Sequence, residues 1–180
     1  MWRQVWDSKG KDAILCHNFP YDIYSIKGSC GPQSQTCLQF NFAVQPGSYS
    51  EYSGRTIPVT KSNIQDRSET ILDQWGKTGS LFPHNVVLVP LGDDFTYTND
   101  AEWDQQYSNY NQILEYINNN NYNAQVQWGT LSDYFAAVNS RIARFDNLVG
   151  DFFVYSDVFS EGMFCQLFIY ISSAVCLYFW

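Results

Sequence analysis

A continuous run of six apolar residues, Val86 to Leu91, sets the strongest single limit on how this chain can fold. The run is short and rich in β-branched residues, which is typical of a strand rather than a helix. A strand that is apolar at every position is buried on both faces, as in parallel sheets covered by helices on each side. The run therefore favours an α/β fold.

Other segments alternate between helical and strand patterns. Apolar residues at helical spacing predict helices, and short apolar runs predict strands. The predicted helices span Asn63–Trp75, Asn99–Asn118 and Leu131–Ala143, and the further predicted strands span Ala13–Pro20, Ala124–Trp128 and Asp151–Ser156. Residues 21–47 carry repeated turn signals and are expected to form a loop. This alternation predicts an α/β fold with a parallel sheet, either a barrel slice or an open doubly wound sheet.

Two of the predicted helices carry start signals. Asn99 suits an N-cap position, and Thr130 with Asp133 resembles a capping box. Helical spacing in the second helix predicts an inner stripe of Trp103, Tyr107, Tyr110, Leu114 and Ile117.

The composition argues against one class of ligand. The net charge is -8, so the chain repels phosphate backbones, and nucleic acid is a poor candidate. Aromatic residues make up 18% of the chain, which suits either stacking on sugar rings or a heavy core. No G-x-G-x-x-G follows any predicted strand, so a dinucleotide fold has no support.

The chain has five cysteines, and Cys30 and Cys37 lie close together in sequence. Gly31 and Pro32 favour a tight turn between them, so the pair fits a disulfide in an oxidising compartment. Two unlinked thiols are the alternative. Zinc is less favoured, because His17 and His84 are the only histidines that could complete a site. We expect His17 to be a satisfied core residue and His84 to lie at the surface.

The two ends of the chain differ in polarity. Residues 1–12 are polar and charged, so no signal peptide is expected at this N-terminus. Residues 163–180 are nearly all apolar and reach the lower length limit for a membrane-spanning helix. A membrane tail anchor, a buried pair of strands and a non-native sequence are three open interpretations of this tail.

The sharpest chemical feature is Gly92-Asp93-Asp94-Phe95, directly after the apolar run. Active sites of parallel α/β proteins lie at the carboxyl ends of strands. Adjacent carboxylates there repel each other, and burial would raise the pKa of one toward the range of a general acid. A solvated turn is the alternative interpretation.

Two other segments are weaker site candidates. Gly150-Asp151-Phe152-Phe153 repeats the Gly-Asp-Phe pattern beside a predicted strand, although a plain turn explains it as well. Tyr21, Asp22 and Tyr24 follow the first predicted strand and could line a site mouth, or could simply pack the loop.

Several of these segments match a known family in order and spacing. They are Trp2-Arg3-Gln4 with Asp7, Leu15–Pro20, Tyr24 with Cys30-Gly31-Pro32 and Cys37, Leu72-Asp73-Gln74-Trp75, Pro90–Phe95, Glu102-Trp103-Asp104, Gly129-Thr130-Leu131 with Asp133-Tyr134-Phe135, and Gly150-Asp151-Phe152-Phe153. On these segments the chain resembles the N-terminal catalytic domain of glycoside hydrolase family 38, the α-mannosidases. It is more similar to the Golgi α-mannosidase II branch than to the lysosomal one.

The resemblance implies a partial, distorted (β/α) barrel from a retaining, zinc-dependent α-mannosidase of N-glycan processing in the Golgi lumen. Asp94 matches the acid/base, Asp93 a residue that shapes the site, and Tyr24 an active-site tyrosine. The substrate implied is a mannose-containing N-glycan, hydrolysed by a pair of carboxylates. The family's pattern also supports a disulfide between Cys30 and Cys37.

The chain departs from the family in several ways. Ser25 stands where related enzymes have an active-site aspartate. The family's nucleophilic aspartate and zinc ligands match no residue here, so no metal site is expected within the chain. Residues 1–157 are therefore interpreted as part of the catalytic domain, and residues 158–180 as an apolar tail unlike the family.

These departures predict that the chain alone is inactive. Two alternatives remain from other functional classes. One is a non-catalytic carbohydrate-binding remnant, and the other is a small tail-anchored membrane protein.

Overall fold

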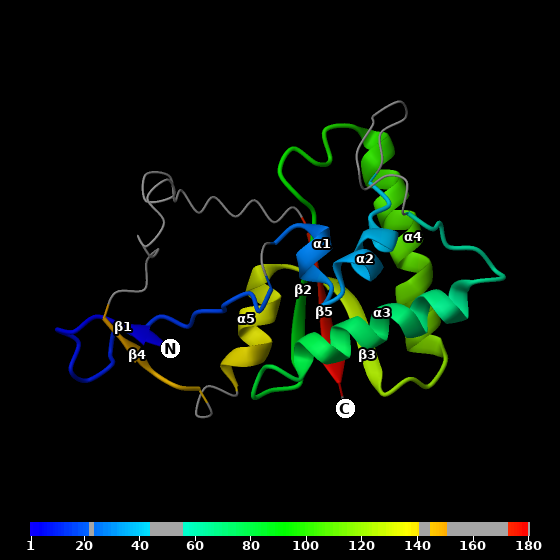
Figure 1. The fold of residues 1–180 in the computed structure, drawn as a ribbon. Coiled ribbons are helices and arrows are strands. Elements are labelled where there is room, and N and C mark those ends of the chain that lie inside the picture. Colours follow the sequence, from blue (N-terminus) through cyan, green and yellow to red (C-terminus); the bar gives the residue numbers. More distant parts are fainter. Residues whose placement is uncertain (22–23, 44–55, 141–144, 151–172, 180) are drawn as a thin grey trace.

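The computed structural model describes residues 1–21, 24–43, 56–140, 145–150 and 173–179 (Figure 1). Within these residues the elements are β1 (Trp2–Arg3), α1 (Ile26–Ser29), α2 (Ser34–Cys37), the 3-10 helix η1 (Leu38–Phe40), α3 (Ile64–Gly79), β2 (Val86–Leu91), α4 (Asp100–Asn119), β3 (Ala124–Gly129), α5 (Leu131–Asn139), β4 (Leu148–Val149) and β5 (Ser173–Phe179). The predicted strand over Val86–Leu91 and the predicted start of α4 are confirmed to the residue. The predicted strand over Asp151–Ser156 lies outside the described residues.

A three-stranded sheet with the order β2-β5-β3 forms the centre of the molecule. β5 runs antiparallel to both neighbours, pairing Tyr178 with Val86 and Phe179 with Ala124. β2 and β3 therefore point in the same direction (Figure 1), as the alternating pattern predicts. β2 and β3 are not direct neighbours, however. The antiparallel strand β5 lies between them, and the sequence pattern did not predict it.

β5 bears on the three interpretations of the apolar tail. Residues 173–179 form a strand that pairs along its length with β2 on one side and β3 on the other. Residues 163–172 lie outside the described part of the chain. In the described residues, no helix combines the length and the apolar character needed to cross a membrane.

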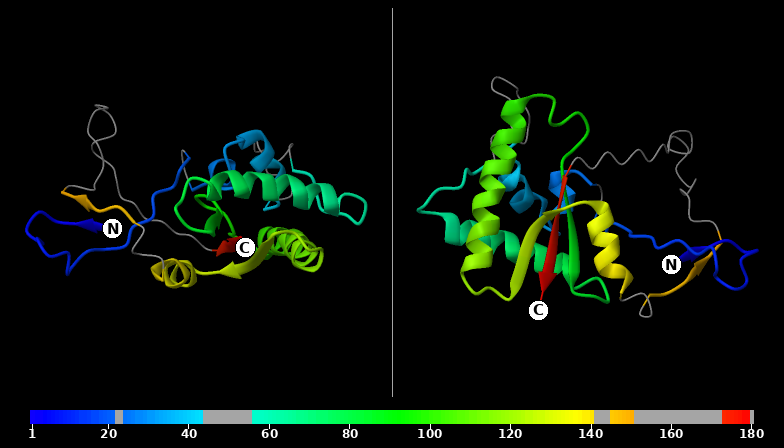
Figure 2. Two further views of the ribbon diagram at one scale, coloured as in Figure 1. Left: turned by 90° about the horizontal axis from the view of Figure 1, so that it is seen from below. Right: turned by 180° about the vertical axis from the view of Figure 1, so that it is seen from behind.

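Every residue of β2 is buried, which confirms that this strand is covered on both faces. Alternate side chains along a strand point to opposite faces of the sheet. Val87, Val89 and Leu91 share a core with side chains of α3 and α4, whereas Val86 and Leu88 pack with Tyr134 and Val138 of α5. Figure 2 shows α3 and α5 on opposite sides of the strands.

The start of α4 follows the predicted capping chemistry. The Asn99 side chain accepts a hydrogen bond from the backbone N–H of Glu102, and the Glu102 carboxylate accepts one from the N–H of Thr98. The first bond satisfies a donor that the first turn of a helix leaves without a partner, and the second ties the residue before the cap to that turn. The predicted capping box of α5 is also present, formed by Thr130 and Asp133.

The predicted inner stripe of α4 is wrong in its first two turns. Trp103 and Tyr107 are 41% and 45% exposed, while Glu102 and Gln106 are buried in their place. Gln106 accepts a hydrogen bond from the N–H of Phe42, so a buried amide replaces an aromatic contact there. A pattern search for apolar residues cannot find a stripe that begins with hydrogen-bonded polar groups.

Two loop and strand expectations are also corrected. Residues 13–20 do not form a strand, and only Ile14 makes an isolated bridge, to Trp2. Leu15 and Phe19 instead pack against the cluster that Val86 and Leu88 form with Tyr134 and Val138 of α5. Their apolar character therefore reflects packing rather than strand pairing. The segment expected to be a loop contains α1, α2 and η1. Gly31 and Pro32 separate α1 from α2, whereas Gly28 lies inside α1, so these turn signals did not exclude short helices.

Helix ends show smaller differences. α3 continues through Gly76 and ends at Gly79, beyond the predicted Trp75. α5 ends at Asn139, before the predicted Ala143, and residues 141–144 lie outside the described residues.

Candidate active site

The turn that follows β2 places Asp93 and Asp94 at the carboxyl end of the strand. Asp93 fixes this turn, because its N–H donates to the Thr96 hydroxyl and its carboxylate accepts from the N–H of Asp94. The Thr96 hydroxyl also donates to the Asp93 carbonyl at 2.8 Å. The Asp93 side chain therefore shapes the turn from which Asp94 projects.

Two residues of the same turn adopt an unusual backbone conformation. Phe95 and Tyr97 have positive φ angles of 57° and 59°. Residues with a side chain enter this left-handed region at a cost of about 1 kcal/mol each, and such strain gathers at functional sites. The Tyr97 hydroxyl donates to the Leu91 carbonyl at 3.4 Å, which ties the turn back to the end of β2.

Tyr24 and Asp94, which are 70 positions apart in sequence, meet at this turn. The Tyr24 hydroxyl donates a hydrogen bond to Oδ1 of Asp94. This bond to a carboxylate, with smaller contributions from burial and from the charges of Asp94 and Asp93, raises the pKa of Tyr24 to about 12. A neighbouring carboxylate favours the protonated phenol, so Tyr24 keeps its proton and donates it in the bond to Asp94.

The exposure of the two carboxylates differs from the expectation. Asp94 is exposed and Asp93 is half-buried in the described structure. The sequence argument for a general acid depended on burial of one of the two, and neither is fully buried by the residues that the structure describes. Phe95, the next residue, is 93% exposed.

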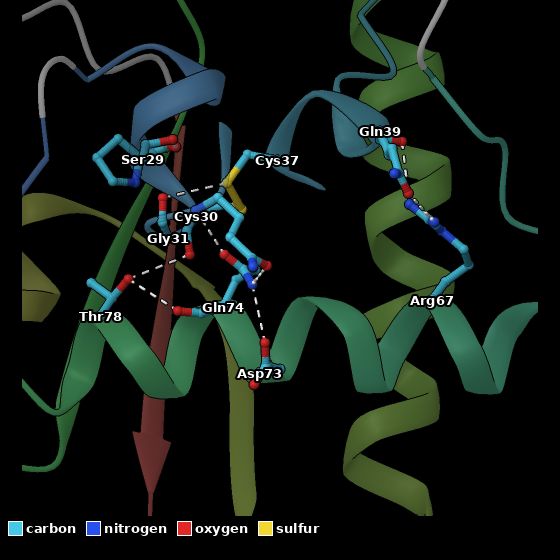
Figure 3. Close-up of a disulfide and its surroundings, with 11 residues drawn as sticks. Ser29, Cys30, Gly31, Cys37, Gln39, Arg67, Asp73, Gln74 and Thr78 are labelled. Carbon is cyan, nitrogen blue, oxygen red and sulfur yellow. Dashed lines mark hydrogen bonds between the residues drawn. A yellow bond between two sulfur atoms is a disulfide. The ribbon is translucent and has the colours of Figure 1, made fainter. Parts of the chain in front are cut away.

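The segment that carries Tyr24 leads into a buried disulfide. Cys30 and Cys37 are joined, and neither is exposed to solvent. Figure 3 shows the bond above α3, beside Gln74 and Thr78. The structure thus forms the pair that the sequence favoured, close to the segment that contributes Tyr24.

The remaining sequence candidates lie partly outside the described residues. Asp22 and the segment 151–157 lie outside the described residues. Tyr21 is half-buried, and the Gly150 carbonyl accepts a hydrogen bond from the Trp2 indole. Of the residues predicted for the site, the described structure brings together Tyr24, Asp93 and Asp94.

The two histidines lie at the opposite end of β2. His17 hydrogen bonds through Nδ1 to Tyr134, but its buried Nε2 has no partner among the described residues, so it is only half satisfied. His84 is half-buried between Phe82 and Phe145 rather than at the surface. Both line a cavity of about 700 Å³ that also borders α5. This cavity is not beside the candidate carboxylates.

The side chains of the described residues do not gather into a metal site. They contain no group of three or more His, Cys, Asp or Glu side chains that could hold a metal ion. The described residues therefore do not fit a zinc site.

Sequence reasoning missed the residues that hold the turn. Thr96 and Tyr97 each bond back toward the strand, and Thr96 lies three residues after Asp93. A hydroxyl residue at this spacing from an aspartate is a known turn signal and could have been found. The contact of Tyr24 with Asp94 spans too much sequence for any local pattern.

Comparison with known proteins gives a consistent result. Residues 1–158 match the family described as "Glycosyl hydrolases family 38 N-terminal domain". The chain is 48% identical to alpha-mannosidase 2 of Spodoptera frugiperda over 89% of its own length, 41% identical to that of Drosophila melanogaster over 87%, and 40% identical to that of Homo sapiens over 87%. It spans only 14–15% of the length of these relatives.

Proposed function

The chain belongs to glycosyl hydrolase family 38, and from that premise we propose that it forms part of the catalytic domain of a retaining α-mannosidase. The family position and the identity to alpha-mannosidase 2 support a role in trimming mannose from N-glycans in the Golgi lumen. The corresponding fold is a slice of a distorted (β/α) barrel, which the shared direction of β2 and β3 supports.

One observation carries the assignment of a site, namely the contact of Tyr24 with Asp94 at the carboxyl end of β2. Asp94 serves as the acid/base. It gives a proton to the oxygen of the leaving group and later removes one from the water that completes hydrolysis. Tyr24 holds one carboxylate oxygen of Asp94, and Asp93 fixes the turn that presents Asp94.

The other half of the reaction lies outside this chain. A retaining glycosidase needs a second carboxylate as nucleophile, about 5 Å from the first. The family's zinc would help to hold the sugar, but the described residues do not fit a zinc site. We place the nucleophile and the zinc ligands in the remainder of a longer protein, and we expect the 180-residue chain alone to be inactive.

The function is tested by moving the segment into a working relative. Residues 1–157 would replace the matching segment of the Spodoptera frugiperda alpha-mannosidase 2, which is 48% identical. The folded chimera should hydrolyse an aryl α-mannoside, and Asp94→Asn should reduce kcat/KM by about 100-fold or more. Asp104→Asn, an exposed aspartate on α4, is the matched control.

The outcomes separate the alternatives clearly. A folded chimera that keeps full activity with Asp94→Asn contradicts the acid/base role. Turnover by the isolated chain contradicts the placement of the nucleophile elsewhere. Saturable mannose binding by the isolated chain without turnover supports a carbohydrate-binding remnant instead.

A further inference from the structure

The segment that carries Tyr24 is attached to β2 at two points. Tyr24 donates to Asp94 at one end, and Ser29 lies five residues further along, as the last residue of α1. The Ser29 hydroxyl donates to the Pro90 carbonyl at 2.7 Å, four residues before Asp94. Residues 24–29 and 90–94 therefore lie against each other and are bonded near both ends.

The second attachment is buried, whereas the first is exposed. Ser29 is only 6% exposed, and its bond to Pro90 is enclosed. A buried hydroxyl that loses its partner costs about 1–3 kcal/mol, so the bond to the Pro90 carbonyl favours one position of α1 against β2. The exposed bond between Tyr24 and Asp94 fixes the position of Tyr24 less strongly, because water competes for both groups.

The residues after Ser29 are fixed to α3. Cys30 is bonded to Cys37, and the Cys30 carbonyl accepts a hydrogen bond from the Thr78 hydroxyl. The Gln74 amide both accepts from the N–H of Gln33 and donates to the side-chain oxygen of Gln33. The loop closed by the disulfide is thus held to α3 on one side while Ser29 holds it to β2 on the other.

We propose that Ser29 is a positioning residue that sets Tyr24 against Asp94, with the disulfide loop and α3 as its fixed support. The importance of this role for catalysis rests on the proposed function. The geometry that positions Tyr24 is independent of it. The active-site tyrosine is placed by a buried bond five residues away, and its own contact with Asp94 follows from that placement. A misplacement of 1 Å is enough to impair catalysis, so such support is needed.

The pKa of Tyr24 gives a direct readout in the 180-residue chain. Tyrosine labelled with ¹³C at Cζ reports phenol ionisation by NMR, and Tyr24→Phe assigns the Tyr24 signal. The contact with Asp94 holds the pKa of Tyr24 at about 12. At pH 10.5 about three quarters of an ordinary tyrosine is ionised, but only a few per cent of a group with a pKa near 12.

Ser29→Ala should lower the pKa of Tyr24 from about 12 toward 10, and Ser29→Thr, which keeps the hydroxyl, should restore it. Ser80→Ala is the control, because Ser80 is exposed and bonds only locally to the Lys77 carbonyl. Asp94→Asn removes the carboxylate, so the pKa of Tyr24 in this variant shows the full effect of losing the contact with Asp94. Should Ser29→Ala fail to fold, Ser29→Cys keeps the volume with a much weaker donor and answers the same question.

A folded Ser29→Ala or Ser29→Cys chain in which Tyr24 titrates as in the wild type overturns the positioning role. That result would leave the proposed function intact. Failure of the Asp94→Asn test in the chimera would remove the proposed function and leave the Ser29 result unaffected. The two ideas therefore fail on different measurements.

Discussion

Nδ1 of His17 lies 2.9 Å from the hydroxyl of Tyr134, so an imidazole from the N-terminal segment is bonded to a side chain of α5. Phe82 stacks on the imidazole with ring centroids 4.9 Å apart. Burial, with a smaller contribution from nearby His84, lowers the pKa of His17 to about 4. His17 is therefore neutral in the folded chain at every pH where the protein is expected to work.

This environment predicts that the chain loses stability in mild acid. Above pH 6.5, His17 is neutral in both the folded and unfolded states and adds no pH dependence. As the pH falls from 6.5 to 4, the unfolded chain binds a proton that the folded chain does not, so the free energy of unfolding decreases. The full loss is about 3 kcal/mol. Urea unfolding at pH 7.5, 5.5 and 4.5 measures it, and His17→Phe should flatten the dependence.

Gly31 should not tolerate a side chain. A Cβ at this position would lie 2.7 Å from Cβ of Gln74 and 2.9 Å from the Gln74 carbonyl oxygen. Because backbone cannot move aside easily, Gly31→Ala should lower the free energy of unfolding by about 1–3 kcal/mol. Gly76→Ala is the matched control, since nothing lies within 4 Å of its Cβ position in α3. That control should instead stabilise the chain by about 0.5–1 kcal/mol.

Removal of the disulfide should destabilise the chain by about 2–3 kcal/mol, because the bond closes a short loop in the unfolded state. Cys30 and Cys37 are seven positions apart. The double variant Cys30→Ser with Cys37→Ser would be compared by urea unfolding with Cys16→Ser. Cys16 is a free, partly exposed cysteine, so its substitution should change the stability little. Equal stability of both variants would contradict the prediction.

Proline should not be accepted in β5. Val175 pairs with Val89 of β2 and with Trp128 of β3, so this strand has ladder partners on both sides. Val175→Pro removes an N–H and should cost at least about 1–3 kcal/mol in the free energy of unfolding. Val175→Thr keeps the donor and the strand preference. A proline variant as stable as the threonine variant would show that residues 173–179 do not form the central strand.

Several regular elements could be predicted well from the sequence, because their signals are local. The apolar run over Val86–Leu91, the cap at Asn99 and the capping box at Thr130 each act within a few residues, and each is present in the structure. The stripe of α4 was misplaced because Glu102 and Gln106 are buried through hydrogen bonds that apolar periodicity does not detect.

The site was predicted only in part for the same reason. Asp94 could be found because it directly follows a recognisable strand, and Tyr24 only through the family resemblance. The role of Ser29 could not be predicted, because no sequence pattern near a serine indicates a bond to Pro90, 61 positions away. Contacts between distant residues depend on the folded arrangement of α1 and β2, which no local spacing encodes.

The position of β5 has a consequence for the order of folding. Among the described strands β5 comes last in the chain, yet it is the middle strand of its sheet. β2 and β3 have no ladder in that sheet until residues 173–179 arrive across a long stretch of chain. Pairing of residues so far apart is entropically costly and slow. The helices, which close locally, should therefore form well before the sheet against which they pack.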